Sequence, residues 1–133
     1  MAITELNGQT LKDLFAGGLV NLRNNSKRID ELNVFPVPDG DTGSNMLMTL
    51  EGAMKTVVSS DEADTSVMMP VFARGALLGA RGNSGVILSQ FIKGFANGCE
   101  GKQSLKIADF TSAFRSGVDR AYEAVIKPTE GTI

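Results

Sequence analysis

The chain has 133 residues, a formal net charge of −2 and an apolar fraction of 42%. This length suits one compact domain, and the apolar fraction is sufficient for a hydrophobic core. The small net charge argues against a protein that binds nucleic acid or a membrane surface through bulk charge. The longest apolar run, near Val67 to Ala73, is far shorter than the roughly 20 residues of a membrane-spanning helix.

The sequence contains one cysteine, Cys99, and no histidine. A single cysteine excludes an internal disulfide and fits the reducing cytoplasm, where we expect the protein. The first residues lack the basic start and apolar run of a signal peptide. Without imidazole, and with one thiol, a zinc site is disfavoured. A metal in this chain would be bound by oxygen ligands, which favours Mg²⁺, Ca²⁺ or Mn²⁺.

Helical periodicity dominates the sequence, and the period-two alternation typical of strands is nearly absent. Apolar residues at three-four spacing predict amphipathic helices, so we predict an all-α fold. The predicted helices start at Thr10, span residues 44–59, start near Ser66, follow Asn83 and start near Asp109.

Four glycines, at positions 75, 79, 94 and 98, lie inside the third and fourth predicted helices. Each costs about 1 kcal/mol relative to Ala in a helix interior. Close packing between helices is one explanation, and a backbone that approaches a ligand is the other. The same stretch carries few charges, so we expect these helices to lie centrally, covered by neighbours.

The loop between the first two predicted helices contains two carboxylates on either side of a glycine. Gly40 permits a sharp backbone turn, so Asp39 and Asp41 can converge on one or two cations. Asn33, earlier in the loop, supplies a neutral oxygen. Mg²⁺ is typically held by one or two carboxylates together with phosphates and water. The loop is therefore a candidate magnesium site; its sequence is Asn33-Val-Phe-Pro-Val-Pro-Asp39-Gly-Asp41-Thr-Gly43.

The second predicted helix opens directly after these carboxylates, at Gly43-Ser44-Asn45. Free N–H groups and the positive dipole end of a helix start favour a phosphate beside the metal. An ordinary turn is the alternative, in which Asp41 or Thr42 only caps the second helix.

A second glycine-containing segment, residues 79–85, separates the third and fourth predicted helices. It can form a second backbone clamp on nucleotide phosphates or ribose, or an ordinary turn capped by Asn83 or Ser84. It is not a P-loop. Arg81 lies seven residues after Arg74, hence on one helical face, and an arginine here can stabilise charge on a transferring phosphoryl group. A solvated or packing arginine is the alternative.

Together, the two motifs resemble the nucleotide-binding L-subunit domain of dihydroxyacetone kinases. The Pro-Val-Pro form of the loop is more similar to the N-terminal domain of the kinase component of bacterial fatty-acid kinase, a subgroup that the last residues also match. The resemblance spans essentially the whole chain and implies a barrel of amphipathic antiparallel helices with the nucleotide at one end. It rests on Leu32–Met46, Gly79–Gln90 and Lys127–Ile133.

The resemblance also implies two Mg²⁺ ions that bridge acidic loop residues to the phosphates of ATP or ADP. The metal ligands would be Asn33, Asp39 and Asp41, and Asn33 stands where the dihydroxyacetone branch has an aspartate. Asp39 and Asp41, with Arg81, would form the catalytic set. The implied nucleotide contacts are Thr42, Gly43, Ser44, Asn45, Asn83, Ser84 and Gly85.

In the fatty-acid branch, the parent enzyme phosphorylates a fatty-acid carboxylate that a separate lipid-binding protein holds. In the dihydroxyacetone branch, a small ketose is phosphorylated on another protein chain. We expect the fatty-acid reaction here. The alternatives are a non-catalytic helical interaction domain and a nucleotide subunit of the dihydroxyacetone (glycerone) kinase type.

The family domain is longer than this chain by several helices. Residues 1–133 are therefore expected to form an N-terminal fragment of a longer nucleotide-binding domain. A shortened barrel exposes core surface, which favours self-association, for instance as a homodimer. We expect weak or absent kinase activity for this chain in isolation.

Overall fold

A computed structural model describes residues 4–33 and 40–125. In these ranges the fold is helical apart from one small two-stranded sheet, so the predicted all-α class is confirmed. The strands β1 (Glu5–Leu6) and β2 (Leu105–Lys106) pair antiparallel. The helices are α1 (Gly8–Leu32), α2 (Thr42–Lys55), α3 (Thr65–Gly79), α4 (Gly82–Gly98) and α5 (Ile107–Glu123).

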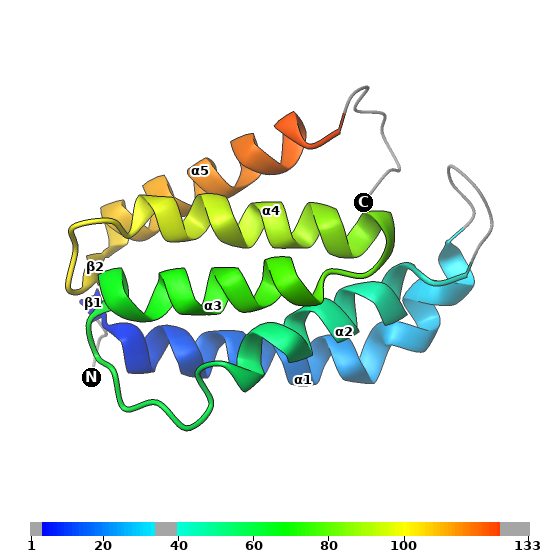
Figure 1. Cartoon of the computed structure of the whole chain (residues 1–133), viewed down its shortest axis with the longest axis horizontal. Coiled ribbons are helices and arrows are strands. Elements are labelled where there is room, and N and C mark those ends of the chain that lie inside the picture. Colours follow the sequence, from blue (N-terminus) through cyan, green and yellow to red (C-terminus); the bar gives the residue numbers. More distant parts are fainter. Residues whose placement is uncertain (1–3, 34–39, 126–133) are drawn as a thin grey trace.

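The first four helices form an antiparallel bundle in which consecutive helices lie side by side (Figure 1). Because α3 runs opposite to both of its neighbours, α2 and α4 run in the same direction and begin at the same end of the molecule (Figure 1). α2 also packs directly against α4, whereas α5 packs along α4 at one edge. None of the helices in the described ranges is long and apolar enough to cross a lipid bilayer.

Local capping explains where α1 and α3 begin. The Asn7 side chain accepts a hydrogen bond from the Thr10 N–H at 3.0 Å, so α1 begins at Gly8, before the predicted start. Asp64 caps α3 in the same way, accepting from the Ser66 N–H at 2.9 Å, close to the predicted start.

The prediction that Arg74 and Arg81 lie on one helical face is wrong. α3 ends at Gly79, and Ala80 has an extended backbone with ψ 132°. Arg81 is the N-cap residue of α4 instead, with φ −125° and ψ 127°. The chain therefore changes direction between the two arginines, and helical spacing does not relate them.

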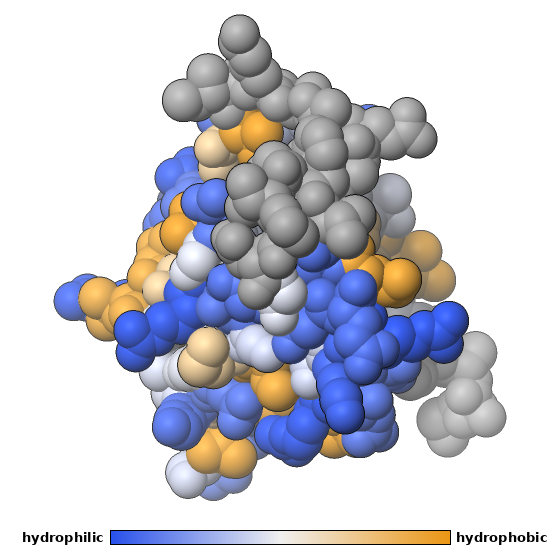
Figure 2. Space-filling view, turned by 90° about the vertical axis from the view of Figure 1, so that its right-hand side faces the viewer, coloured by the Kyte–Doolittle hydropathy of each residue, from blue (hydrophilic) through white to orange (hydrophobic). Residues whose placement is uncertain are grey.

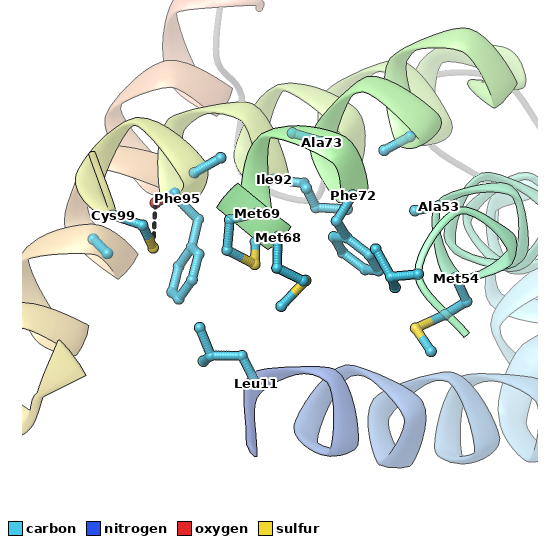
Figure 3. Close-up of a cluster of buried hydrophobic side chains, with 14 of the residues drawn as sticks. Leu11, Ala53, Met54, Met68, Met69, Phe72, Ala73, Ile92, Phe95 and Cys99 are labelled. Atoms are coloured by element: carbon cyan, nitrogen blue, oxygen red, sulfur yellow. Dashed lines mark hydrogen bonds between the residues drawn. The ribbon is translucent and has the colours of Figure 1, made fainter. Parts of the chain in front are cut away.

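A chain of aromatic rings crosses the core and joins four helices. Phe15 of α1 lies 4.6 Å, ring centre to ring centre, from Phe72 of α3 and 5.9 Å from Phe95 of α4. Phe95 in turn meets Phe110 of α5 at 5.6 Å. Phe72 and Phe95 are almost completely buried beside Leu11 and the methionines of α3 (Figure 3). Each buried side chain of this size contributes roughly 2 kcal/mol to folding.

Glycines in α4 allow close contact with α5. A Cβ atom on Gly94 would lie 2.4 Å from the Ser116 carbonyl oxygen, and one on Gly98 would lie 2.5 Å from the Ala113 Cα. Close helix packing, the first explanation for these glycines, is confirmed at both positions. The expected coverage of the charge-poor helices holds for one face only, because Val67 and Leu78 on the outer side of α3 are exposed.

Candidate functional site

The two sequence motifs meet where α2 and α4 begin. The Ser84 hydroxyl, in the first turn of α4, donates to the Thr42 carbonyl oxygen at 3.0 Å. The Arg81 backbone N–H donates to Thr49 Oγ1 at 3.2 Å, and the Thr49 hydroxyl donates to the Asn45 carbonyl oxygen at 2.8 Å. Segments about 40 residues apart in sequence are thus joined by direct hydrogen bonds. Both helix dipoles point their positive ends towards the same region.

A glycine is required at the start of α4. Gly82 has φ +64°, in the left-handed region that favours glycine. A Cβ atom at this position would also lie 2.2 Å from Asn45 Nδ2. The two motifs therefore approach each other closely at Gly82 and Asn45, both within the segments that carry the family resemblance.

Side chains of α1 cap the start of α2. Asn33 Oδ1 accepts hydrogen bonds from the N–H groups of Asp41, at 3.0 Å, and Thr42, at 3.2 Å. Asp30 Oδ1 accepts from the Ser44 N–H at 3.0 Å, and Asp30 Oδ2 accepts from the Ser44 hydroxyl. The backbone donors of Thr42 and Ser44, which were expected to face a phosphate, are thus directed at α1 in this structure.

Asp30 is a residue of this site that the sequence reasoning missed. It lies one helical turn before Asn33, so the two side chains share a face at the end of α1. That spacing was a usable signal, but the apolar periodicity that predicted this helix does not continue into its last turns. The polar continuation of the helix to Leu32 gave no comparable pattern.

Asp41 occupies the N-cap position of α2, but its carboxylate makes no cap hydrogen bond. The alternative in which Asp41 only caps the helix therefore does not describe this structure, because Asn33 and Asp30 perform the capping. Asp41 is exposed, and Gly40 before it has φ +68°, which provides the sharp turn expected there. The carboxylate of Asp41 is thus available to a cation in solution.

Asp39, the Pro-Val-Pro segment before it and the matched segment Lys127–Ile133 lie outside the described residues. Within the described ranges, no group of three or more acidic, histidine or cysteine side chains gathers at one point. Asp41 and the Asn33 oxygen are the described members of the predicted metal set. The Asn33 oxygen already accepts two N–H groups, so of these two residues it is Asp41 whose side-chain oxygens make no cap hydrogen bond.

The start of α4 differs from that of α2, because Asn33 and Asp30 accept hydrogen bonds from N–H groups at the start of α2, whereas no side chain in the described ranges accepts from the first N–H groups of α4. The N-terminal residues Gly82 and Asn83 are exposed, whereas Ser84 and Gly85 are buried against α2. The Arg81 side chain is exposed at the same place. A helix start of this kind can accept an anion at its first N–H groups.

Figure 2 shows the end of the molecule at which these two helices begin, and its described surface is mostly hydrophilic. Asp41, Arg81 and Asn83, at the starts of these two helices, are exposed. A polar surface that carries both acidic and basic side chains suits a charged ligand better than an apolar one.

The fold and these motifs define a DAK2 domain. The sequence model of that family matches residues 36–133, and this chain belongs to the family. DAK2 domains are nucleotide-binding domains of the dihydroxyacetone kinase type.

Three relatives illustrate the similarity. Protein YloV of Bacillus subtilis (strain 168) is 45% identical over 133 residues, which cover all of this chain and 24% of YloV. The uncharacterized proteins SH1689 of Staphylococcus haemolyticus and SAUSA300_1119 of Staphylococcus aureus are 44% and 43% identical over 131 residues, or 98% of this chain. The chain spans about a quarter of the length of these relatives, 24% in each case.

Proposed function

We propose that this domain binds Mg–ATP for a kinase that phosphorylates the carboxylate of a fatty acid held by a separate lipid-binding protein. The observation that carries the nucleotide part is the convergence of two helix starts beside Asp41. One helix start, at Arg81, makes no side-chain cap hydrogen bond, and the carboxylate of Asp41 makes none either.

The first turn of α4 is proposed to bind phosphate oxygens. Its N–H groups and positive dipole end favour negative charge, and the exposed Arg81 adds a full positive charge. Asn83 and Ser84 would lie near the phosphates or ribose. The buried Ser84 hydroxyl donates to Thr42, so its main effect is to hold α2 in place.

The acidic loop is proposed to hold the metal. Asp39 and Asp41 would bind Mg²⁺, which neutralises the phosphate charge and orients the γ-phosphoryl group. Asn33 is the third proposed ligand. Its Oδ1 atom already accepts from Asp41 and Thr42, so it also orients the loop from the protein side.

The proposed transfer needs no general base in this domain. A fatty-acid carboxylate is already ionised near neutral pH, and one of its oxygens attacks the γ-phosphorus while the bond to the β-phosphate oxygen breaks. The products are an acyl phosphate and ADP. The acceptor class rests on the similarity of the Pro-Val-Pro loop to fatty-acid kinase, and the acceptor pocket would belong to another protein.

A binding titration tests the nucleotide and metal proposal. Calorimetry should show Mg²⁺-dependent ADP binding to this chain, and changing Asp39 and Asp41 together to alanine should abolish it. The control changes the exposed Asp13 and Asp119 to alanine, which alters net charge equally and should leave binding intact. Undiminished Mg²⁺-dependent binding in the Asp39/Asp41 variant would contradict the metal site.

A second assay addresses the acceptor. A longer protein that contains this domain should consume ATP when a lipid-loaded acceptor protein is added, and not when dihydroxyacetone is added. The reverse result would identify the dihydroxyacetone alternative. Failure of that longer protein to bind Mg–nucleotide at all would favour a non-catalytic helical domain.

A further inference from the structure

Asp30 joins α1 to α2 through a single partner residue. It lies in the last turns of α1 and is half-buried. Both carboxylate oxygens accept from Ser44, one from the backbone N–H at 3.0 Å and the other from the hydroxyl. Hydrogen bonds to an ionised acceptor are about twice as strong as neutral ones, so this contact is a firm attachment.

The attachment is placed where it affects the whole first turn of α2. Ser44 is the third residue of α2. Asn33 accepts hydrogen bonds from the N–H groups of Asp41 and Thr42, which precede Ser44 in the chain. Asn33 is the C-cap residue at the very end of α1, whereas Asp30 lies inside the helix. Asp30 is therefore the anchor that is itself held within the hydrogen-bonded helix.

We propose that Asp30 is a positioning residue: by holding Ser44 it fixes the first turn of α2 on α1 and sets the direction in which Asp41 faces the nucleotide site. The nucleotide part of this inference rests on the proposed function. The pairing also fills the start of α2 with an internal carboxylate, which directs phosphates to the start of α4.

A direct metal-ligand role for Asp30 is the competing explanation, and two substitutions distinguish them. Asp30→Ala removes both contacts with Ser44. Asp30→Asn retains them in altered form, because the amide oxygen accepts from the Ser44 N–H and the amide NH₂ donates to the hydroxyl. Asn lacks the charge of a metal-binding carboxylate. Asp13→Ala, an exposed change on the same helix, is the control.

The first measurement is amide hydrogen exchange by NMR, without nucleotide. Asp30→Ala should speed exchange about tenfold at Ser44 and also at Asp41 and Thr42, neither of which Asp30 contacts. Asp30→Asn and Asp13→Ala should leave all three close to the wild-type rate. Faster exchange at Ser44 alone would overturn the proposal, because the contact would then be only local.

The second measurement is Mg–ADP affinity by calorimetry. Asp30→Ala should weaken binding about tenfold, and Asp30→Asn should restore most of it. Equal losses in both variants would overturn positioning in favour of direct metal binding. If neither the wild-type chain nor a longer protein that contains it binds Mg–ADP, the proposed function fails, while the exchange experiment still decides whether Asp30 orders the start of α2.

Discussion

The hydroxyl of Ser84 donates a 3.0 Å hydrogen bond to the carbonyl oxygen of Thr42, and so connects the first turn of α4 to the first turn of α2. Both helices begin at this end of the bundle (Figure 1). The bond therefore fixes the relative position of the two helix starts that the nucleotide proposal requires. Ser84 is only 6% exposed, so water does not readily replace the contact.

Ser84→Ala should destabilise the fold by about 1 kcal/mol, because one buried hydrogen bond is lost. It should also weaken Mg–ADP binding, since α2 and α4 are no longer held in register. Urea unfolding measures the first effect, and calorimetry the second.

Ser89→Ala is the matched control for that change. Ser89 is also buried in α4, but its hydroxyl donates to the Val86 carbonyl oxygen of the same helix at 2.7 Å. Its replacement should leave nucleotide affinity unchanged. Equal losses of affinity in the two variants would show that the Ser84–Thr42 bond has no specific role.

Asp41→Ala should lower Mg²⁺-dependent ADP affinity at least tenfold with little change in stability. The physical reason is that the Asp41 carboxylate makes no cap hydrogen bond, so its loss costs the helix little. Calorimetry and thermal unfolding of the same variant measure the two effects.

Asp64→Ala should show the opposite result. Asp64 is likewise an N-cap aspartate, but its carboxylate accepts from the Ser66 N–H at 2.9 Å and from the Ser66 hydroxyl at 2.6 Å. Losing this cap should cost about 1 kcal/mol of stability and leave nucleotide binding unaffected. A large stability loss in Asp41→Ala would assign that carboxylate a structural role.

Cys99 should be unreactive in the folded protein. Burial raises the pKa of its thiol from 9.0 to about 11, an effect that nearby Lys102 only partly offsets. At pH 8 roughly one thiol in a thousand is then ionised, and the thiolate is the reactive form. Thiol labelling with and without denaturant measures this difference, and rapid labelling of the native protein would contradict it.

The same pKa shift makes stability depend on alkaline pH. The raised folded-state pKa means that the unfolded chain releases the thiol proton first. The contribution of Cys99 to stability is therefore fully present below about pH 9 and is lost as the pH rises towards 11. Cys99→Ser does not titrate there, so its urea midpoint should fall less over this range than that of the wild type.

Periodicity in the sequence was sufficient to predict the helical class, because apolar spacing reflects the buried faces of α3 and α4 directly. Helix ends depended on single polar side chains. The predicted start of α3 near Ser66 was nearly correct although its cap Asp64 was not recognised, whereas α1 begins after its cap Asn7 and not at Thr10. The polar last part of α1 carried no apolar pattern, so Asp30 was not recognised as part of the site.

The meeting of the two motifs could not be derived from either motif alone. The contact between Ser84 and Thr42 depends on the parallel direction of α2 and α4, which is a consequence of the tertiary arrangement. The family resemblance predicted a shared nucleotide site, but not that α1 side chains would cap α2. The local sequence of a helix start does not reveal whether its N–H groups are free or are capped by a residue from elsewhere in the chain.

Gly82→Ala should destabilise the fold for two separable reasons, one in the backbone and one in the contact with Asn45. The new residue would have to adopt φ +64°, which costs about 1 kcal/mol for a residue with a side chain, and its Cβ would lie 2.2 Å from Asn45 Nδ2. Gly101→Ala separates these effects, because Gly101 has φ +76° but no heavy atom within 4 Å of a Cβ. Gly101→Ala should therefore show the backbone cost alone in urea unfolding, and Gly82→Ala should lose more stability and also weaken Mg–ADP binding.

Adding Asn45→Ala to Gly82→Ala removes the side chain that the new Cβ meets, and should recover part of the extra stability loss. Equal losses of stability in the two glycine variants, with no recovery in the double variant, would contradict the close approach of the two motifs.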